Sequence, residues 1–308
     1  MSLTTLIYGG GPFYSCGAPV INDLKQSGFT TVVAWAVHVH TNGDLIFNSP
    51  TIVSDGQYVG DPTWPGLLAD LKEGATSVNR VLVSIGGWDT QDFPNIKSLL
   101  FPKPGDYPNN PQIGPDTILY QNFQALKNAI PTIDGVDFDD ETLYDQPTTV
   151  AFAQMLHGLG YQVTFCPYTN PISNSSFWVD CLFQLNSTTP NLVTGFNLQC
   201  YAGGAVNNPK DWINAIQKKM GGDFDAKGFV YPGLWCIHTP PHEPKCSAGD
   251  CPVTITKQFQ TWKSDGIQGG FIWLYDDIVK CAISGVCGSG VSMSSAAYAA
   301  AIAKGLGG

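Results

Sequence analysis

Apolar residues along the chain gather in eight short, nearly continuous runs, and the stretches between these runs place apolar residues at helical spacing. The runs cover residues 3–9, 30–39, 80–88, 135–141, 162–168, 193–201, 228–235 and 269–276. Unbroken apolar runs of this length are typical of strands buried on both faces in a parallel sheet. The pattern therefore predicts eight parallel strands.

Amphipathic helices are expected between these strands, over residues 19–27, 65–73, 117–129, 148–159, 210–220, 254–265 and 294–304. Asp116 and Ser294 are candidate N-caps, and Gly28, Gly160 and Gly221 are candidate helix stops. Eight strand–helix units favour a closed barrel, so we expect the α/β class and a single (β/α)8 TIM barrel spanning residues 1–308. The longest connection, 89–115, should overhang the C-terminal face of the barrel, where the active sites of such barrels lie.

Composition narrows the classes of partner. The 308 residues include 25 Asp and Glu against 15 Lys and Arg, for a net charge of −10. Such a chain repels phosphates, so we expect neither a nucleic-acid partner nor an anionic membrane surface. No apolar run reaches about 18 residues, so no transmembrane helix is expected. The 8 Trp, 12 Tyr and 16 Phe need burial or a ligand with apolar faces.

Cysteine usage bears on the compartment. The chain has nine cysteines, and Cys246 with Cys251, like Cys281 with Cys287, lies close enough in sequence to close a small disulfide loop. Disulfides of this kind are typical of oxidising compartments, so we expect a secreted, extracellular protein. The first residues contain no signal peptide, so export implies that a leader has been trimmed from this sequence.

The same region allows a different interpretation, a structural metal site. His238, His242 and Glu243 precede Cys246 and Cys251, and all five are ligand-type residues. Three prolines in this segment, however, preclude the helix that two histidines four residues apart need in order to face one metal ion. We therefore favour a disulfide-closed loop, and we expect no metal and no cofactor.

The most informative segment is the acidic end of the fourth predicted strand. Because side chains alternate along a strand, Asp137, Asp139 and Glu141 share one face, while Val136 and Phe138 occupy the other. A solvated acidic turn would not explain those two apolar residues. Three carboxylates on one inward face repel one another, and their pKa values are expected to shift. The pattern predicts a general acid at Glu141, with its proton held by Asp139 and the charge of Asp139 set by the deeper Asp137.

This segment carries a family resemblance. Residues 134–141 read Asp-Gly-Val-Asp-Phe-Asp-Asp-Glu and resemble the DGxDxDxE signature of family 18 glycoside hydrolases, which include chitinases and endo-β-N-acetylglucosaminidases. Residues 84–88, Ser-Ile-Gly-Gly-Trp, resemble the SxGG motif of the family on the third strand. Gln199 and Tyr201 resemble its QxY motif on the sixth strand, and Trp273 its tryptophan on the eighth. Four motifs in the order of the family make the resemblance specific.

The resemblance implies a retaining hydrolase that cleaves β-1,4 bonds of chitin or other N-acetylglucosamine oligosaccharides, with the substrate acetamide as nucleophile. It implies that Glu141 is the general acid and base, that Asp139 orients the acetamide, and that Asp137 lies beneath. Tyr201 would donate a hydrogen bond to the acetamide oxygen, and Gln199 would hold a polar group of the substrate. We expect a monomer that acts without a cofactor.

The remaining motif residues shape the site. Trp273 would form the apolar floor under the sugar, Gly86 and Gly87 would leave space beside it, and Ser84 would support Asp137. Trp88 is a candidate for stacking on a sugar. Trp35 and Trp235, at the ends of other predicted strands, are candidates for the same role.

The chain also departs from the family pattern. Ala202 stands where the family often has Asn or Asp, and Asp140 stands where an apolar residue is usual. Residues 236–253 are too few for the α+β domain that many members insert there, so we expect a shallow groove and internal cleavage. Two alternatives keep the fold, an endo-β-N-acetylglucosaminidase acting on N-glycan cores and a non-catalytic chitin-binding lectin. The intact Glu141 argues against the lectin.

Overall fold

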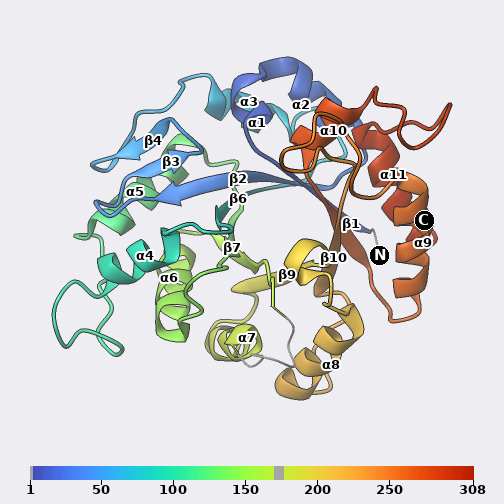
Figure 1. Ribbon diagram of the computed structural model, residues 1–308. Coiled ribbons are helices and arrows are strands. Elements are labelled where there is room, and N and C mark those ends of the chain that lie inside the picture. The colour runs from blue at the N-terminus through green and yellow to red at the C-terminus, as the bar shows by residue number, and fades with distance from the viewer. Residues whose placement is uncertain (1–2, 170–176) are drawn as a thin grey trace.

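The computed structural model describes residues 3–169 and 177–308, and within them eight parallel strands close into a barrel (Figure 1). In spatial order these strands are β1 (Thr4–Gly9), β11 (Gly269–Trp273), β10 (Val230–Trp235), β9 (Val193–Gln199), β8 (Gln162–Phe165), β7 (Gly135–Asp139), β6 (Arg80–Gly86) and β2 (Thr31–Val39). The pairing of β1 with β2 closes the ring. The predicted TIM barrel and all eight predicted strands are confirmed.

Helices surround the barrel, as Figure 1 shows. They are α1 (Pro12–Ser15), α2 (Gly17–Gln26), α3 (Trp64–Asp70), α4 (Asp92–Leu100), α5 (Ile118–Ala129), α6 (Gln146–Gly158), α7 (Phe177–Thr188), α8 (Pro209–Met220), α9 (Pro252–Lys263), α10 (Tyr275–Cys281) and α11 (Ser295–Leu306). Ser294 caps α11 as predicted, whereas Thr117, and not Asp116, caps α5 through a hydrogen bond from the backbone N–H of Tyr120. None of the described helices is long and apolar enough to cross a membrane.

The sequence pattern did not predict three short strands. The antiparallel strands β3 (Leu45–Phe47), β4 (Thr51–Ser54) and β5 (Gln57–Tyr58) extend the sheet outward from β2. They are short and partly exposed, so they lack the unbroken apolar run of a barrel strand. The expected 89–115 connection also contains α4. Five barrel strands end two or three residues earlier than predicted: 80–88 at Gly86, 135–141 at Asp139, 162–168 at Phe165, 193–201 at Gln199 and 269–276 at Trp273.

Side chains on the two faces of each strand pack into two separate cores. Outward residues such as Val136 and Phe138 of β7 join the large core under the helices, where Phe138 stacks on Phe152 of α6 at 5.0 Å. Inward residues form a small core in the barrel, which includes Tyr8 and Cys166. The alternation expected for β7 is therefore present, and it directs Asp137 and Asp139 into the barrel.

The disulfides differ from the pairs expected from sequence proximity. Cys246 pairs with Cys281, and Cys251 pairs with Cys287. The expected pairs, Cys246 with Cys251 and Cys281 with Cys287, are wrong because β10 and β11 are neighbours in the barrel, and the segments that follow them meet. The first of these segments, between β10 and α9, spans only residues 236–251 and holds no inserted domain.

Candidate active site

A cavity of about 340 Å³ opens at the carboxyl ends of the barrel strands. It is rich in aromatic side chains and contains two carboxyl groups. The described residues that line it are Trp35, Gly87, Trp88, Asp139, Glu141, Tyr168, Gln199, Tyr201, Ala202, Gly203, Trp235 and Trp273. Seven of the ten residues expected at the site therefore surround one cavity, while Ser84, Gly86 and Asp137 lie behind its wall.

Asp137 lies beneath this cavity and is completely buried. One carboxylate oxygen accepts hydrogen bonds from Tyr8 and Ser84, each at 2.9 Å. The other accepts from Thr164 at 2.6 Å and from Asn197 at 2.9 Å. Burial raises the pKa of Asp137, and these four hydrogen bonds oppose the rise because they favour the ionised form. Asp137 is thus a hydrogen-bonded anchor rather than a group open to ligand.

Gln199 joins the two carboxyl groups that reach the cavity. Its amide nitrogen donates to Asp139 Oδ1 at 2.8 Å and to Glu141 Oε1 at 3.0 Å. Burial, reinforced by the charges of Glu141 and Asp137, raises the pKa of Asp139 well above its ordinary value. Burial also raises the pKa of Glu141, against the opposing effect of hydrogen bonds from Gln199 and Asp139. The pair therefore keeps a proton at higher pH than solvated carboxyl groups do.

The two glycines of the third barrel strand have different surroundings. Gly86 has φ +108°, and a Cβ there would lie 2.1 Å from the carbonyl oxygen of Asp139. Gly86 therefore lets β6 approach the backbone of β7, and it does not line the cavity. Gly87 does line it, and its N–H donates to the same carbonyl oxygen at 2.8 Å. A Cβ on Gly87 would lie 3.1 Å from the ring of Trp35.

Aromatic rings form most of the cavity wall. The ring of Trp273 lies 6.2 Å from that of Tyr201 at an interplanar angle of 24°, and Trp35 meets Trp273 edge-on at 4.8 Å. Trp88 is 74% exposed and lies 6.1 Å from Tyr168 at the rim. Burial raises the pKa of Tyr201 well above its ordinary value, so its phenol stays a donor. Flat apolar faces beside a few polar groups suit a ring-shaped, uncharged ligand such as a sugar.

Comparison with known proteins identifies solved structures that share this architecture. Neither a protein-family model nor a curated protein matches the sequence. A GH18 chitinase from Pseudoalteromonas aurantia matches in structure with a TM-score of 0.61 and 14% identity, over 98% of this chain and 99% of that one. The catalytic domain of a hyperthermophilic chitinase from Pyrococcus furiosus matches with a TM-score of 0.66 and 9% identity, over 99% and 95%. The chain has the fold of the GH18 chitinases.

The resemblance to family 18 glycoside hydrolases that the motifs indicate is thus matched by the fold. The chitinase fold also occurs in a protein described as a chitinase-like agglutinin, from Robinia pseudoacacia. That structure has a TM-score of 0.57 and 12% identity, over 96% of this chain and 99% of the agglutinin. Identities this low establish the fold alone.

Asp140 has a structural role within the chitinase fold. It is fully buried, and its carboxylate lies in the turn that follows β7. Its carboxylate accepts hydrogen bonds from the backbone N–H groups of Thr142, Leu143 and Tyr144, at 3.1, 2.8 and 2.9 Å. Asp140 therefore fixes the turn that carries Glu141 into the cavity, which explains why this position is acidic here.

Four residues at the site lie outside the matched motifs. Tyr8, Thr164 and Asn197 were not expected there, although they supply three of the four hydrogen bonds to Asp137. Tyr168 was not expected to line the cavity. A signal was present for the first three, because a polar side chain on the inward face of a buried strand needs a partner inside the barrel.

The alternative metal site does not form. Both of its cysteines are in disulfides, and the ring of His238 stacks on Trp235 at 3.8 Å. Among the described residues, no group of three or more His, Cys, Asp or Glu side chains is arranged to hold a metal ion.

Proposed function

We propose that this protein is a retaining glycoside hydrolase that cleaves β-1,4 bonds in N-acetylglucosamine polymers such as chitin, with the substrate acetamide as nucleophile. The observation that carries the proposal is the bridge from Gln199 to both Asp139 and Glu141, inside an aromatic cavity. The chitinase fold of the chain supports it.

The spacing of the carboxyl groups supports retention of configuration. Both Asp139 and Glu141 accept from the same amide nitrogen, at 2.8 and 3.0 Å, so their bonded oxygens can lie no farther apart than these two lengths together. Inverting enzymes separate their carboxyl groups by roughly 6.5–9.5 Å to admit a water molecule. The pair in this cavity is too close for that arrangement.

Each residue then has a defined task. Glu141 protonates the glycosidic oxygen as the acetamide oxygen of the sugar attacks the anomeric carbon, and it later activates the water that opens the intermediate. Its raised pKa, caused by burial, keeps the proton on Glu141 to a higher pH than an exposed glutamate would. Asp139 orients the acetamide N–H, while the phenol of Tyr201 donates to the acetamide oxygen. Trp273 supports the apolar face of the sugar.

Replacing the acid tests the proposal. In Glu141→Gln the side chain keeps its shape but cannot deliver a proton, so hydrolysis of chitotetraose should fall by at least about 10²–10⁴-fold. Binding of the same oligosaccharide, measured by calorimetry, should change by less than about threefold. Glu73→Gln is the matched control, because Glu73 is an exposed glutamate outside the cavity. Wild-type activity in Glu141→Gln would contradict the assigned role.

A sugar-binding protein without catalysis is the second candidate, because the agglutinin from Robinia pseudoacacia has a similar fold. An endo-β-N-acetylglucosaminidase acting on N-glycan cores is the third. Incubating the wild type with chitotetraose and with a high-mannose glycoprotein, and weighing the products by mass spectrometry, separates all three. Turnover of neither substrate, together with oligosaccharide binding, favours the lectin.

The short segment 236–251 leaves the groove without an added wall, so we propose that cleavage occurs inside polymer chains. Early products of mixed length support internal cleavage, and disaccharide alone contradicts it. We also propose that the protein is secreted, because paired disulfides of this kind persist in oxidising compartments.

A further inference from the structure

Trp235 is an aromatic residue of the cavity that none of the matched motifs contains. It ends β10, pairs in register with Trp273 of β11, and lines the cavity. Its ring meets that of Tyr201 at 5.8 Å and 63°. Trp235 therefore borders the same space as the proposed sugar floor.

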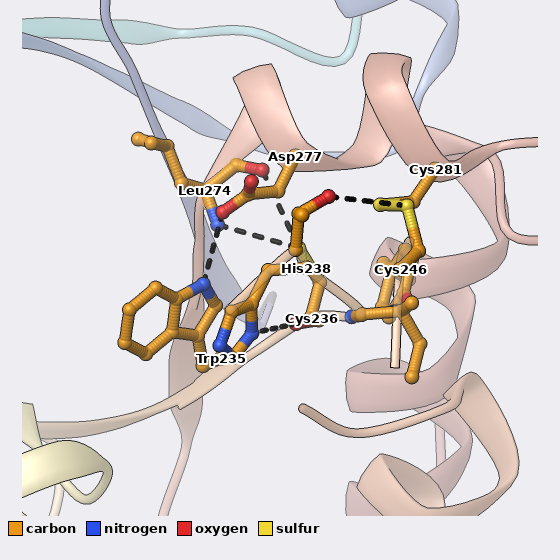
Figure 2. The surroundings of a disulfide bond; sticks show 10 residues. Trp235, Cys236, His238, Cys246, Leu274, Asp277 and Cys281 are labelled. Carbon is orange, nitrogen blue, oxygen red and sulfur yellow. Dashed lines mark hydrogen bonds between the residues drawn. A yellow bond between two sulfur atoms is a disulfide. The ribbon is translucent and has the colours of Figure 1, made fainter. Parts of the chain in front are cut away.

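Two side chains hold the indole of Trp235 in place, as Figure 2 shows. The imidazole of His238 stacks on one face, with ring centroids 3.8 Å apart and an interplanar angle of 14°. The indole N–H donates to Asp277 Oδ2 at 3.0 Å. The stacked imidazole fixes the plane of the indole, and the hydrogen bond to Asp277 fixes the rotation of the indole within that plane.

His238 is itself held firmly. It is buried, and its Nδ1 lies 3.1 Å from the carbonyl oxygen of Cys236. A carbonyl oxygen only accepts, so Nδ1 carries the proton. The backbone of His238 pairs with Ala248 across the same segment, which keeps the imidazole against the indole.

The two supports come from different segments that a disulfide joins. His238 belongs to residues 236–251, whereas Asp277 lies on α10, one helical turn before Cys281. The Cys246–Cys281 bond links these segments at that point (Figure 2). The second bond, Cys251–Cys287, links positions at the start of α9 and beyond the end of α10.

We propose that Trp235 contacts an N-acetylglucosamine unit in the cavity, and that His238, Asp277 and the Cys246–Cys281 disulfide are positioning groups that hold its indole in the binding orientation. The inference rests on the proposed function, because it assigns a further contact for the same substrate. It assigns no chemical step to Trp235, so its loss should raise KM and spare kcat.

Substitutions at Trp235 and Asp277 test the contact and its support. Trp235→Ala should raise the KM for chitotetraose about 3- to 10-fold, as expected for the loss of one aromatic contact, while kcat changes less than about twofold. Asp277→Ala should raise KM in the same direction. Asp277→Asn should restore it, because the amide oxygen still accepts from the indole N–H.

The two disulfides provide a matched pair of variants. They span almost the same sequence separation, 35 and 36 residues, so their removal should lower the unfolding temperature by similar amounts. The double variant Cys246→Ala/Cys281→Ala should also raise KM about threefold. Cys251→Ala/Cys287→Ala should leave KM at the wild-type value. Equal effects of the two pairs on KM overturn the role assigned to the first disulfide.

The outcomes separate this inference from the proposed function. If the wild type does not hydrolyse chitotetraose, the proposed function fails, whether or not the oligosaccharide binds. If the wild type hydrolyses it and Trp235→Ala keeps the wild-type KM, only the sugar contact fails. Calorimetric binding of chitotetraose to Glu141→Gln, with and without Trp235→Ala, repeats the comparison without turnover, and equal affinities again overturn the contact.

Discussion

Asp139 shows how a buried acid at the proposed catalytic site can lower the stability of the fold. Its side chain is 2% exposed, and burial with two neighbouring charges raises its pKa. An acid with a raised folded-state pKa binds its proton more tightly in the folded chain than in the unfolded one. Its favourable contribution to stability is therefore complete below the unfolded pKa, and it is lost as the pH rises through the raised folded value.

We accordingly expect Asp139→Asn to be more stable than the wild type near pH 8. The change removes the buried charge but keeps an oxygen that accepts from Gln199. The unfolding temperature should rise by about 2 °C or more near pH 8, and the gain should shrink toward pH 4. Thermal unfolding of both proteins across this range measures the difference. A gain that is equal at every pH would contradict the argument.

The sequence pattern predicted the acidic residues of the site, but not most of the residues that donate hydrogen bonds to Asp137. Alternation along one strand placed Asp137 and Asp139 on the same face without knowledge of any other strand. The donors to Asp137 come from other strands, and Tyr8 lies 129 residues away in sequence. Their contact depends on the register of the closed barrel, which no local pattern contains.

At the scale of elements, one buried amide holds the β3–β5 extension against the helix layer. Asn122 of α5 donates to the carbonyl oxygen of Gly43 at 2.6 Å and accepts from the N–H of Gly56 at 2.7 Å. These glycines lie in the turns before β3 and between β4 and β5. A single side chain thus fixes both turns.

Asn122→Ala should leave two backbone groups without partners, at a cost of about 2 kcal/mol or more in the free energy of unfolding. Activity should stay within about twofold of wild type, because β3–β5 contributes no residue to the cavity lining. Urea unfolding measures the loss, and hydrogen exchange should locate it in residues 45–58. Asn128→Ala, at an exposed position of the same helix, is the control. A fall in activity with unchanged stability would be the contrary result.

The barrel strands were predicted because they are uniformly buried, and several short elements were missed because they are not. Barrel strands are buried on both faces, so their apolar runs stand out, whereas β3–β5 and α10 are short and partly exposed. The helix α4 was missed inside a Pro-rich stretch, because Pro94 falls in its first turn, where proline is tolerated. The disulfide pairs were wrong because proximity in sequence does not show which barrel strands are neighbours.

At the scale of the whole molecule, the net charge of −10 should attract cationic oligosaccharides, whether or not the protein can cleave them. Of the described residues that line the cavity, Asp139 and Glu141 are acidic and none is cationic. A fully deacetylated, cationic chitosan oligomer should therefore be attracted to the protein at low salt. It lacks the acetamide that the proposed mechanism uses as its nucleophile, so it should bind without being cleaved.

We expect chitosan tetramers to inhibit hydrolysis of chitotetraose at low ionic strength, and the inhibition should weaken at least about threefold when salt rises from about 20 to about 300 mM, because salt screens the attraction. The KM for neutral chitotetraose should change less than about twofold over the same range. Steady-state kinetics at both salt concentrations, with mass analysis of the chitosan products, measure these effects. Cleavage of the deacetylated tetramer at a comparable rate would mean that a carboxylate, and not the acetamide, attacks the sugar.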